Sequence, residues 1–219
     1  MRVLFLTLVL AATSALAADK APDLAPLKKW IARQDDFRSV AADFTQTRSL
    51  RVLRDPVARP GRLWFATPGS FRWELGTPAK TIVLRKGDSV LIITPDKKKA
   101  ERRAAAGAAE KTGGMAMMRF PIAKDFADFQ RQFEILASAV SERRCDVEVV
   151  PRDPQARKFM TVMKITFDTV SGHMLAFEMV FKDGSSLRNE FTNVRVNQKI
   201  EREQFDYDLT GFEVKDVKD

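Results

Sequence analysis

The feature that most restricts the fold of this 219-residue chain is a regular series of turn signals that follows Ala41. The segments between the turns are short and alternate apolar with polar residues, as in strands with one buried face. In the run from Phe71 to Leu75, bulky apolar residues hold the odd positions and charged residues the even ones. We predict about ten or eleven antiparallel strands from this pattern. The turn signals include Asp55-Pro56, Pro60-Gly61, Pro68-Gly69, Gly76-Thr77-Pro78, Gly87-Asp88, Pro95-Asp96, Asp153-Pro154, Ser171-Gly172 and Asp183-Gly184, and the later strand-like runs cover 133–139, 145–150, 159–167, 174–181 and 187–196.

Three segments break the alternation. The first can form a helix that is capped by Asp23 and carries Pro26 in its first turn. The apolar face of this helix consists of Leu24, Leu27, Trp30 and Ile31. The stretch 104–120 favours helix or loop, and 122–132 can form another short helix. With no internal repeat and no linker, the sequence predicts one α+β domain.

A sheet of this length has a larger dry face than a few short helices can cover. Such a sheet tends to curl into a barrel or half-barrel with an interior. We therefore predict a curved antiparallel sheet that forms an incomplete β-barrel, with short α-helices as a lid. Two alternatives remain for the interior, because its aromatic residues can either pack as an ordinary core or surround a ligand.

Residues 1–17 have the features of a secretory signal peptide. Arg2 supplies the positive start, a compact apolar stretch follows, and the segment ends in a small-x-small pattern at Ala17. The apolar stretch is shorter than the ~20 residues that cross a bilayer, which disfavours the alternative of an uncleaved anchor. Since Cys145 is the only cysteine, none is available near the cleavage site to accept a lipid. We predict a soluble exported protein whose single domain spans 18–219.

The composition excludes several classes of function. One cysteine and one histidine cannot supply the three or four Cys and His ligands of a zinc site. The sequence contains no phosphate-binding loop, no dinucleotide fingerprint and no serine-nucleophile motif. The histidine, His173, lies in an expected hairpin turn, which disfavours it as a general base. We predict neither enzymatic activity nor a cofactor or metal.

The net charge of +8 includes two dense basic clusters, at 97–103 and 143–144. An exported chain meets membranes and envelope polymers, so no nucleic-acid partner is expected. Both clusters fall where turns are expected, which favours solvated loop charge. The alternative is a docking patch for an anionic membrane surface or an acidic partner.

Several short motifs occur in an order and spacing that point to a known family. They are Phe44-Thr45-Gln46, Gly61-x-Leu63-Trp64, Pro68-x-x-Phe71-x-Trp73, Ile82-Val83-Leu84-x-x-Gly87 with Pro95, Gly172 with Phe177, and Phe205 followed by Gly211 and Val214. Over nearly the whole mature chain, this series resembles the periplasmic outer-membrane lipoprotein carriers of the LolA type. The resemblance implies a half-barrel whose helical lid covers an apolar cavity for lipoprotein acyl chains.

The resemblance also implies which residues form that cavity and its lid. The expected lid residues are Leu27, Ile31, Met115, Met117 and Met118, and the expected cavity residues are Leu63, Phe65, Phe71, Trp73, Leu75, Phe177, Met179 and Phe181. Flexible methionines suit a lid that must re-pack around chains of variable shape. Ordinary core or helix packing is the alternative for each of these residues.

One position departs from the family pattern. Members of the best-studied kind have an arginine before the proline of the second strand pair, where it is thought to latch the lid, and this chain has Thr67 there. A threonine has one short hydroxyl in place of five fixed donors, so it cannot form the same latch. We expect that apolar contacts hold the lid closed instead. The alternative is a divergent carrier with a different cargo.

The function that the resemblance implies is carriage of lipoproteins through the periplasm. The protein would act as a monomer, take cargo from an inner-membrane donor complex, and deliver it to an outer-membrane acceptor. Two alternatives use the same half-barrel: a lipid-sensing regulatory module that reports to a protein partner, and a carrier of another lipid.

Overall fold

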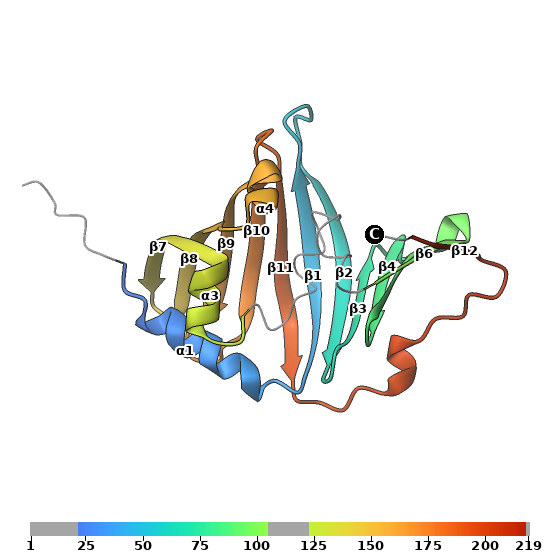
Figure 1. The fold of residues 1–219 in the computed structure, drawn as a ribbon, viewed down its shortest axis with the longest axis horizontal. Helices are drawn as coiled ribbons and strands as arrows, with labels where there is room; N and C mark the ends of the chain where they lie inside the picture. Colours follow the sequence, from blue (N-terminus) through green and yellow to red (C-terminus); the bar gives the residue numbers. More distant parts are fainter. Residues whose placement is uncertain (1–21, 105–122, 218–219) are drawn as a thin grey trace, which may run out of the picture.

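The computed structural model describes residues 22–104 and 123–217, and its centre is one open, curved sheet of twelve strands (Figure 1). All neighbouring strands pair antiparallel except β12 and β6, which are parallel. The order across the sheet is β12-β6-β5-β4-β3-β2-β1-β11-β10-β9-β8-β7. The strands are β1 (Ser39–Ser49), β2 (Val57–Ala66), β3 (Ser70–Leu75), β4 (Thr81–Lys86), β5 (Ser89–Thr94), β6 (Lys99–Ala104), β7 (Phe133–Ser141), β8 (Arg144–Pro151), β9 (Met160–Asp168), β10 (Met174–Phe181), β11 (Ser186–Val196) and β12 (Glu213–Asp216).

This architecture confirms the predicted fold class, a curved antiparallel sheet with a few short helices. The sheet remains open because β7 and β12 form separate edges. Strand β12 was not predicted, since its four residues show no alternation and all are exposed. Backbone pairing with β6 holds it.

Helix α1 (Ala25–Arg33) packs closely against the sheet rather than covering it loosely. The carboxylate of Asp23 accepts a hydrogen bond from the amide of Ala25 at 3.0 Å, next to the helix start. The helix buries Leu27, Trp30 and Ile31, whereas Leu24, predicted for the same face, is its N-cap and is only half-buried. A 3-10 turn, η1 (Gln34–Asp36), continues it towards β1. This face anchors α1 over the β8–β9 region, on the concave side of the sheet (Figure 1).

Two further helices lie on the same side. Helix α3 (Phe126–Gln132) starts after Asp125, whose carboxylate accepts a hydrogen bond from the Asp128 amide at 2.7 Å, and it buries Phe129 completely. The helix lies within the predicted segment 122–132, and its first helical residue is Phe126. Helix α4 (Pro154–Phe159) was predicted only as a turn, although Asp153 and a proline in the first turn are also the signals of a helix start.

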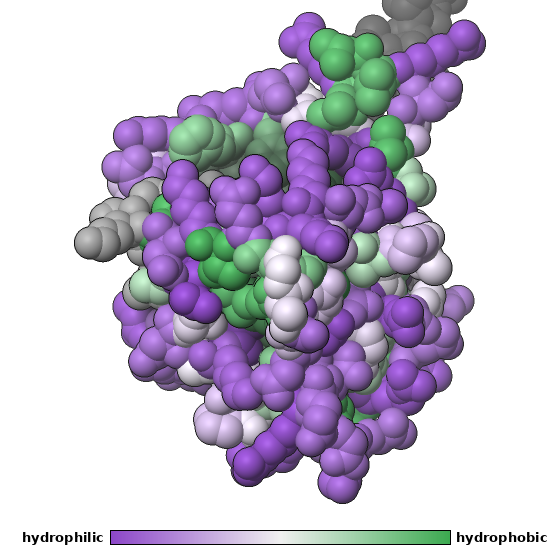
Figure 2. Space-filling view, turned by 90° about the vertical axis from the view of Figure 1, so that its right-hand side faces the viewer, coloured by the Kyte–Doolittle hydropathy of each residue, from purple (hydrophilic) through white to green (hydrophobic). Residues whose placement is uncertain are grey.

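Strands β4 and β5 are buried on both faces. Their residues on the concave side, including Val83 and Val90, pack with Phe65 and Phe71. On the outer side, a second cluster forms beneath the C-terminal segment 197–212, which includes the 3-10 turn η4 (Arg202–Phe205). This cluster consists of Ile82, Leu84, Ile93 and Ala100, with Ala79, Leu91, Tyr207, Leu209 and Phe212 packed against it. The side that carries β12 is otherwise mostly hydrophilic, with small apolar patches (Figure 2).

Arg72 ties the C-terminal segment to the outer face of β3. Its guanidinium donates to the carbonyl oxygens of Gln204 at 2.9 Å and Asp206 at 3.0 Å. It also pairs with Glu74 at 2.6 Å, and both side chains are only 13% exposed. The pair is therefore partly shielded from solvent, where hydrogen bonds of a charged group contribute most.

Replacing Arg72 by methionine should lower the free energy of unfolding by about 3 kcal/mol, because two carbonyls lose a charged donor and Glu74 loses its partner. The matched control is Lys86→Met, which breaks an ion pair with Asp206 that is more than half exposed. It should cost at most ~0.5 kcal/mol. Urea unfolding measures both losses, and limited proteolysis should cut within 197–212 only in Arg72→Met. Equal losses for the two variants would contradict this role of Arg72.

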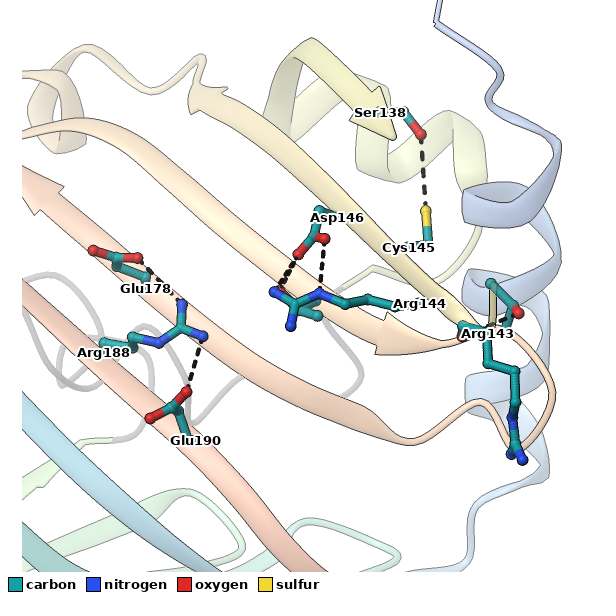
Figure 3. Close-up of polar contacts among 10 residues, drawn as sticks. Ser138, Arg143, Arg144, Cys145, Asp146, Glu178, Arg188 and Glu190 are labelled. Atoms are coloured by element: carbon teal, nitrogen blue, oxygen red, sulfur yellow. Dashed lines mark hydrogen bonds and ion pairs between the residues drawn. The ribbon is translucent and has the colours of Figure 1, made fainter. Parts of the chain in front are cut away.

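The outer face of β8 to β11 carries a ladder of ion pairs (Figure 3). Arg188 pairs with Glu178 at 3.3 Å and with Glu190 at 3.0 Å, and Arg144 pairs with Asp146 at 2.8 Å. The Arg144 guanidinium holds the pKa of the Asp146 carboxyl below its ordinary value. These charged side chains show that this face of the sheet is exposed to solvent.

Both basic clusters found in the sequence are largely paired. In the cluster 143–144, Arg143 also pairs with Asp168 at 3.1 Å. In the cluster 97–103, three of the cations have carboxylate partners. These pairs are Lys99 with Glu213, Arg102 with Asp216, and Arg103 with Glu101. The pairing favours local neutralisation over a docking patch at these two places.

Candidate functional site

A cavity of about 1210 Å³ lies between the concave face of the sheet and the helices. It exceeds the roughly 300–1,000 Å³ of common small-molecule sites. Most of its wall is apolar, and many of the side chains are aromatic. The apolar and aromatic side chains are those of Trp30, Phe37, Val40, Ala42, Leu63, Phe65, Phe71, Trp73, Phe133, Pro151, Ala156, Phe159, Met160, Met163, Met174, Phe177, Phe181, Phe191, Val194 and Val196. The site can therefore hold a long apolar molecule.

The polar side chains of the wall are few and come mainly from the ends of helices and turns. They are Gln34, Arg131, Gln132, Arg152, Asp153, Gln155 and His173. Arg152 is oriented by a hydrogen bond from its Nε to the carbonyl of Gln130 at 2.9 Å. Within residues 22–104 and 123–217 no cluster of three or more His, Cys, Asp and Glu could hold a metal ion. The arrangement is suited to burying apolar surface.

An aromatic stack of residues from β1 and β3 supports the cavity wall, which its members Phe71 and Trp73 line. The ring of Phe44 stacks on Trp73 with 3.8 Å between centroids, and Phe71 lies at 6.4 Å from Trp73. Phe44 pairs across strands with Gly61, where an added Cβ would overlap the Phe44 ring. Because Gly61 has no Cβ, the Phe44 ring can occupy this space. Three of the motifs found in the sequence, those with Phe44, Gly61 and Trp73, meet in this one packing unit.

Six of the residues predicted for the cavity lie on its wall. They are Leu63, Phe65, Phe71, Trp73, Phe177 and Phe181. The two-residue period of β2, β3 and β10 puts them on the concave face, as the alternation predicts. Their contact with a lipid stays a prediction.

Four predicted residues pack in or against the core instead of lining the wall. Leu27 and Ile31 are at most 1% exposed because the short helix α1 uses them to attach to the sheet, and Trp30 is its residue that reaches the cavity. Met179 is completely enclosed in the same core, and Leu75 packs against it. The predicted lid residues Met115, Met117 and Met118 lie outside the described residues.

The wall also includes residues that the sequence did not single out. Phe191, Val194 and Val196 come from β11, where Asn193 adopts a positive φ of 51°. This residue shifts the alternation, so the wall passes from odd to even positions along one strand. Met163 follows the alternation of β9 and could have been found from it, whereas Met160 and Met174 lie beyond irregularities in the β9–β10 pairing and have the opposite parity.

Thr67 lies in the turn between β2 and β3, exposed and away from the cavity wall. Its amide donates to the carbonyl of Arg38 at 2.9 Å. Cys145 is fully buried beside Ser138, with 3.8 Å between Sγ and Oγ (Figure 3), and burial raises the pKa of its thiol. It is thus a small buried core residue, as predicted.

The turn between β9 and β10 is held by Asp168. Its carboxylate accepts hydrogen bonds from the amides of Ser171 at 2.6 Å and Val170 at 2.9 Å, and it pairs with Arg143. These bonds, chiefly that from the Ser171 amide, lower the pKa of Asp168 to about 2. The folded protein therefore strongly favours the ionised carboxylate.

The same turn attaches α1 beside the cavity. The carbonyl of Gly172 accepts a hydrogen bond from Trp30 Nε1 at 3.0 Å, and the carbonyl of Val170 accepts one from Arg33 at 2.6 Å. Trp30 also stacks on Phe167 with 4.6 Å between ring centroids. The Asp168 turn thus positions the one side chain of α1 that lines the cavity.

Replacing Asp168 by asparagine should change how stability depends on pH. Because the folded pKa lies below the ordinary 3.8, the carboxylate stabilises the folded state above about pH 4, and this contribution is lost as the pH falls towards 2. We expect Asp168→Asn to lower the free energy of unfolding by about 1–2 kcal/mol at pH 7 and by much less at pH 2. Urea titrations at the two pH values measure this. An equal loss at both would contradict the role of the charge.

Comparison with known proteins agrees with this architecture. Residues 35–208 match the family model described as outer membrane lipoprotein carrier protein LolA. A protein of Chromohalobacter salexigens named outer-membrane lipoprotein carrier protein is 21% identical over 95% of each chain. A protein of the same name from Chromobacterium violaceum is 34% identical over 49% of this chain and 51% of its own.

A solved structure shows the same fold. An uncharacterized conserved protein from Thermus thermophilus superposes with a TM-score of 0.56 at 8% identity, covering 87% of this chain and 99% of its own. In the part of the chain that the structure covers, no helix is long and apolar enough to span a membrane. The family comprises non-enzymatic carrier proteins. Since its model matches most of the sequence, the chain belongs to the LolA family of outer membrane lipoprotein carrier proteins.

Proposed function

We propose that the protein takes up the acyl chains of lipoproteins in its cavity and carries them through the periplasm from the inner to the outer membrane. The observation that carries this proposal is the large apolar cavity of about 1210 Å³ between the sheet and the helices. An acyl chain of about sixteen carbons costs roughly 12 kcal/mol to hold in water, at ~0.8 kcal/mol per CH₂. A carrier therefore needs a deep apolar chamber.

The proposal assigns each part of the site a role in binding. Phe71 and Trp73, which stack with the buried Phe44, supply a rigid wall on one side, and Met160, Met163 and Met174 supply adaptable surface on the other. No chemical step is involved, and the protein acts as a monomer without a cofactor. Its partners are an inner-membrane donor complex and an outer-membrane acceptor.

Native mass spectrometry of the protein purified from the periplasm tests this function. A co-purifying lipoprotein is the expected result. A free lipid in its place would favour carriage of another lipid, and a stable complex with a regulatory protein would favour lipid sensing. A protein that carries no lipid, and that binds no fluorescent fatty acid when empty, would contradict any cavity function.

Cell fractionation tests the proposed location. The mature chain should begin at Ala18 and appear with the soluble periplasmic proteins, because we propose that residues 1–17 are removed on export. An N-terminus that still starts at Met1 would contradict this location. So would a tight membrane association that survives a high-salt wash.

A further inference from the structure

The turn between β1 and β2 exposes apolar and basic side chains together. This seven-residue turn spans Leu50–Pro56, and Val52 is 88% and Leu53 47% exposed. Arg51 and Arg54 flank them and are exposed, and neither forms an ion pair with any described residue. They thus differ from the paired cations of the two basic clusters. Exposed apolar side chains between free cations are typical of a surface that meets anionic lipid.

Two other segments lie at the same end of the molecule, opposite α1 (Figure 1). They are the β10–β11 turn and helix α4. The Arg51 side chain reaches to 4.0 Å from the Cβ position of Gly184, so the two turns lie side by side. A surface pocket beside these segments is lined by Arg48 on β1, by Lys158 and Lys182 from the other two segments, and by one carboxylate, that of Asp183. Phe159, at the end of α4, borders this pocket and is 68% exposed.

We call this end of the molecule the basic rim, formed by Val52, Leu53 and Phe159 with Arg51, Arg54, Lys158 and Lys182. The rim is continuous with the cavity, because Phe159 and Phe181 line both the cavity and the surface pocket. An acyl chain that leaves the cavity here would emerge between the apolar side chains of the rim. The rim is therefore the place where the cavity would open towards a surface that the rim contacts.

We propose that the basic rim docks on the surface of an anionic phospholipid bilayer. Arg51 and Arg54 contact lipid phosphates, and Val52 and Leu53 enter the boundary between headgroups and acyl chains. Docking in this way turns the Phe159 end of the cavity towards the bilayer. This last step rests on the proposed carriage of acyl chains, whereas docking itself does not.

The test measures partition of the full protein onto vesicles by sedimentation. We expect binding to vesicles of phosphatidylglycerol and phosphatidylcholine at low salt, and little binding to pure phosphatidylcholine. The double variant Arg51→Gln/Arg54→Gln should bind about 30-fold more weakly, since each cation near an anionic surface contributes about fivefold. The matched control Lys97→Gln/Lys215→Gln removes two exposed cations elsewhere and should bind as the wild type does.

Insertion is tested with a single dye. Leu53→Cys, labelled with an environment-sensitive fluorophore, should shift its emission to the blue when anionic vesicles are added, whereas the same label at Val170→Cys should not. Val170 is 61% exposed in the β9–β10 turn, at the α1 end, and the buried Cys145 should not react. Equal shifts at both sites would contradict docking through the rim, as would equal binding to both vesicle types.

The outcome is separable from that of the proposed function. None of the substituted rim residues lines the cavity, so the variants should bind a fluorescent fatty acid in solution with unchanged affinity. Normal fatty-acid binding with no vesicle binding would overturn the docking proposal alone. Failure of fatty-acid binding by the wild type would overturn the cavity function alone. Binding to an acidic protein but not to anionic vesicles would also overturn the docking proposal.

Discussion

Replacing Leu63 by aspartate is expected to weaken the binding of a fluorescent fatty acid by about 100-fold. Leu63 lies on the cavity wall and pairs across strands with Trp73. A carboxylate at this position must lose its water, or take up a proton, when an acyl chain fills the cavity. That cost is roughly 2–3 kcal/mol, which corresponds to the expected loss of affinity. Fluorescence titration of the empty protein measures it.

The matched control places a carboxylate on the other face of the sheet. Arg195 is exposed on β11, between the wall residues Val194 and Val196, so Arg195→Asp should leave the affinity within about twofold. Leu63→Met keeps an apolar side chain of similar volume and should also bind normally. A folded Leu63→Asp variant that binds as tightly as the wild type would show that the chain lies elsewhere.

A large loss of stability is also expected from adding one methyl group at Gly61. Its Cβ would overlap the Phe44 ring and lie 2.5 Å from the backbone oxygen of Glu74. The ring can rotate away, but the carbonyl belongs to the adjacent strand β3. Gly61→Ala should therefore lower the free energy of unfolding by about 3 kcal/mol. Urea unfolding measures this loss.

A double-mutant cycle separates the ring from the backbone. Phe44→Leu removes the ring that stacks on Trp73 and leaves space for an alanine at position 61. The loss in the double variant Phe44→Leu/Gly61→Ala should be smaller than the sum of the single losses by at least ~1 kcal/mol. Additive losses would mean that the Phe44 ring does not determine the need for a glycine there.

The fold class could be predicted because alternation and turn signals are local properties. The run from Phe71 to Leu75 gives the correct concave face for β3, and the continuous apolar run Ile82-Val83-Leu84 belongs to a strand buried on both faces. Strand β12 could not be predicted, because backbone pairing with a strand about a hundred residues away defines it. Helix α4 was missed because Asp153 and Pro154 can begin either a turn or a helix.

The site was predictable only where the phase of the alternation stays constant. On β2, on β3 and on β10 from Ala176 to Phe181 it does, and six wall residues follow from it. On β11, Asn193 changes the phase of the alternation, and no residue type in that run indicates the change. The role of Leu27 and Ile31 depends on how closely α1 approaches the sheet. Trp30 fixes that distance through Gly172, 142 residues further along the chain.

The central claim is that an acyl chain occupies the space between the concave face and the helices. It is tested most directly by loading the protein with palmitic acid that carries a photoreactive diazirine at the end of its chain, followed by irradiation and peptide mapping. We predict adducts within β2, β3 and β10, on wall residues such as Leu63, Trp73 and Phe177. Adducts confined to the C-terminal segment 197–212 or to the charged outer face would contradict the account.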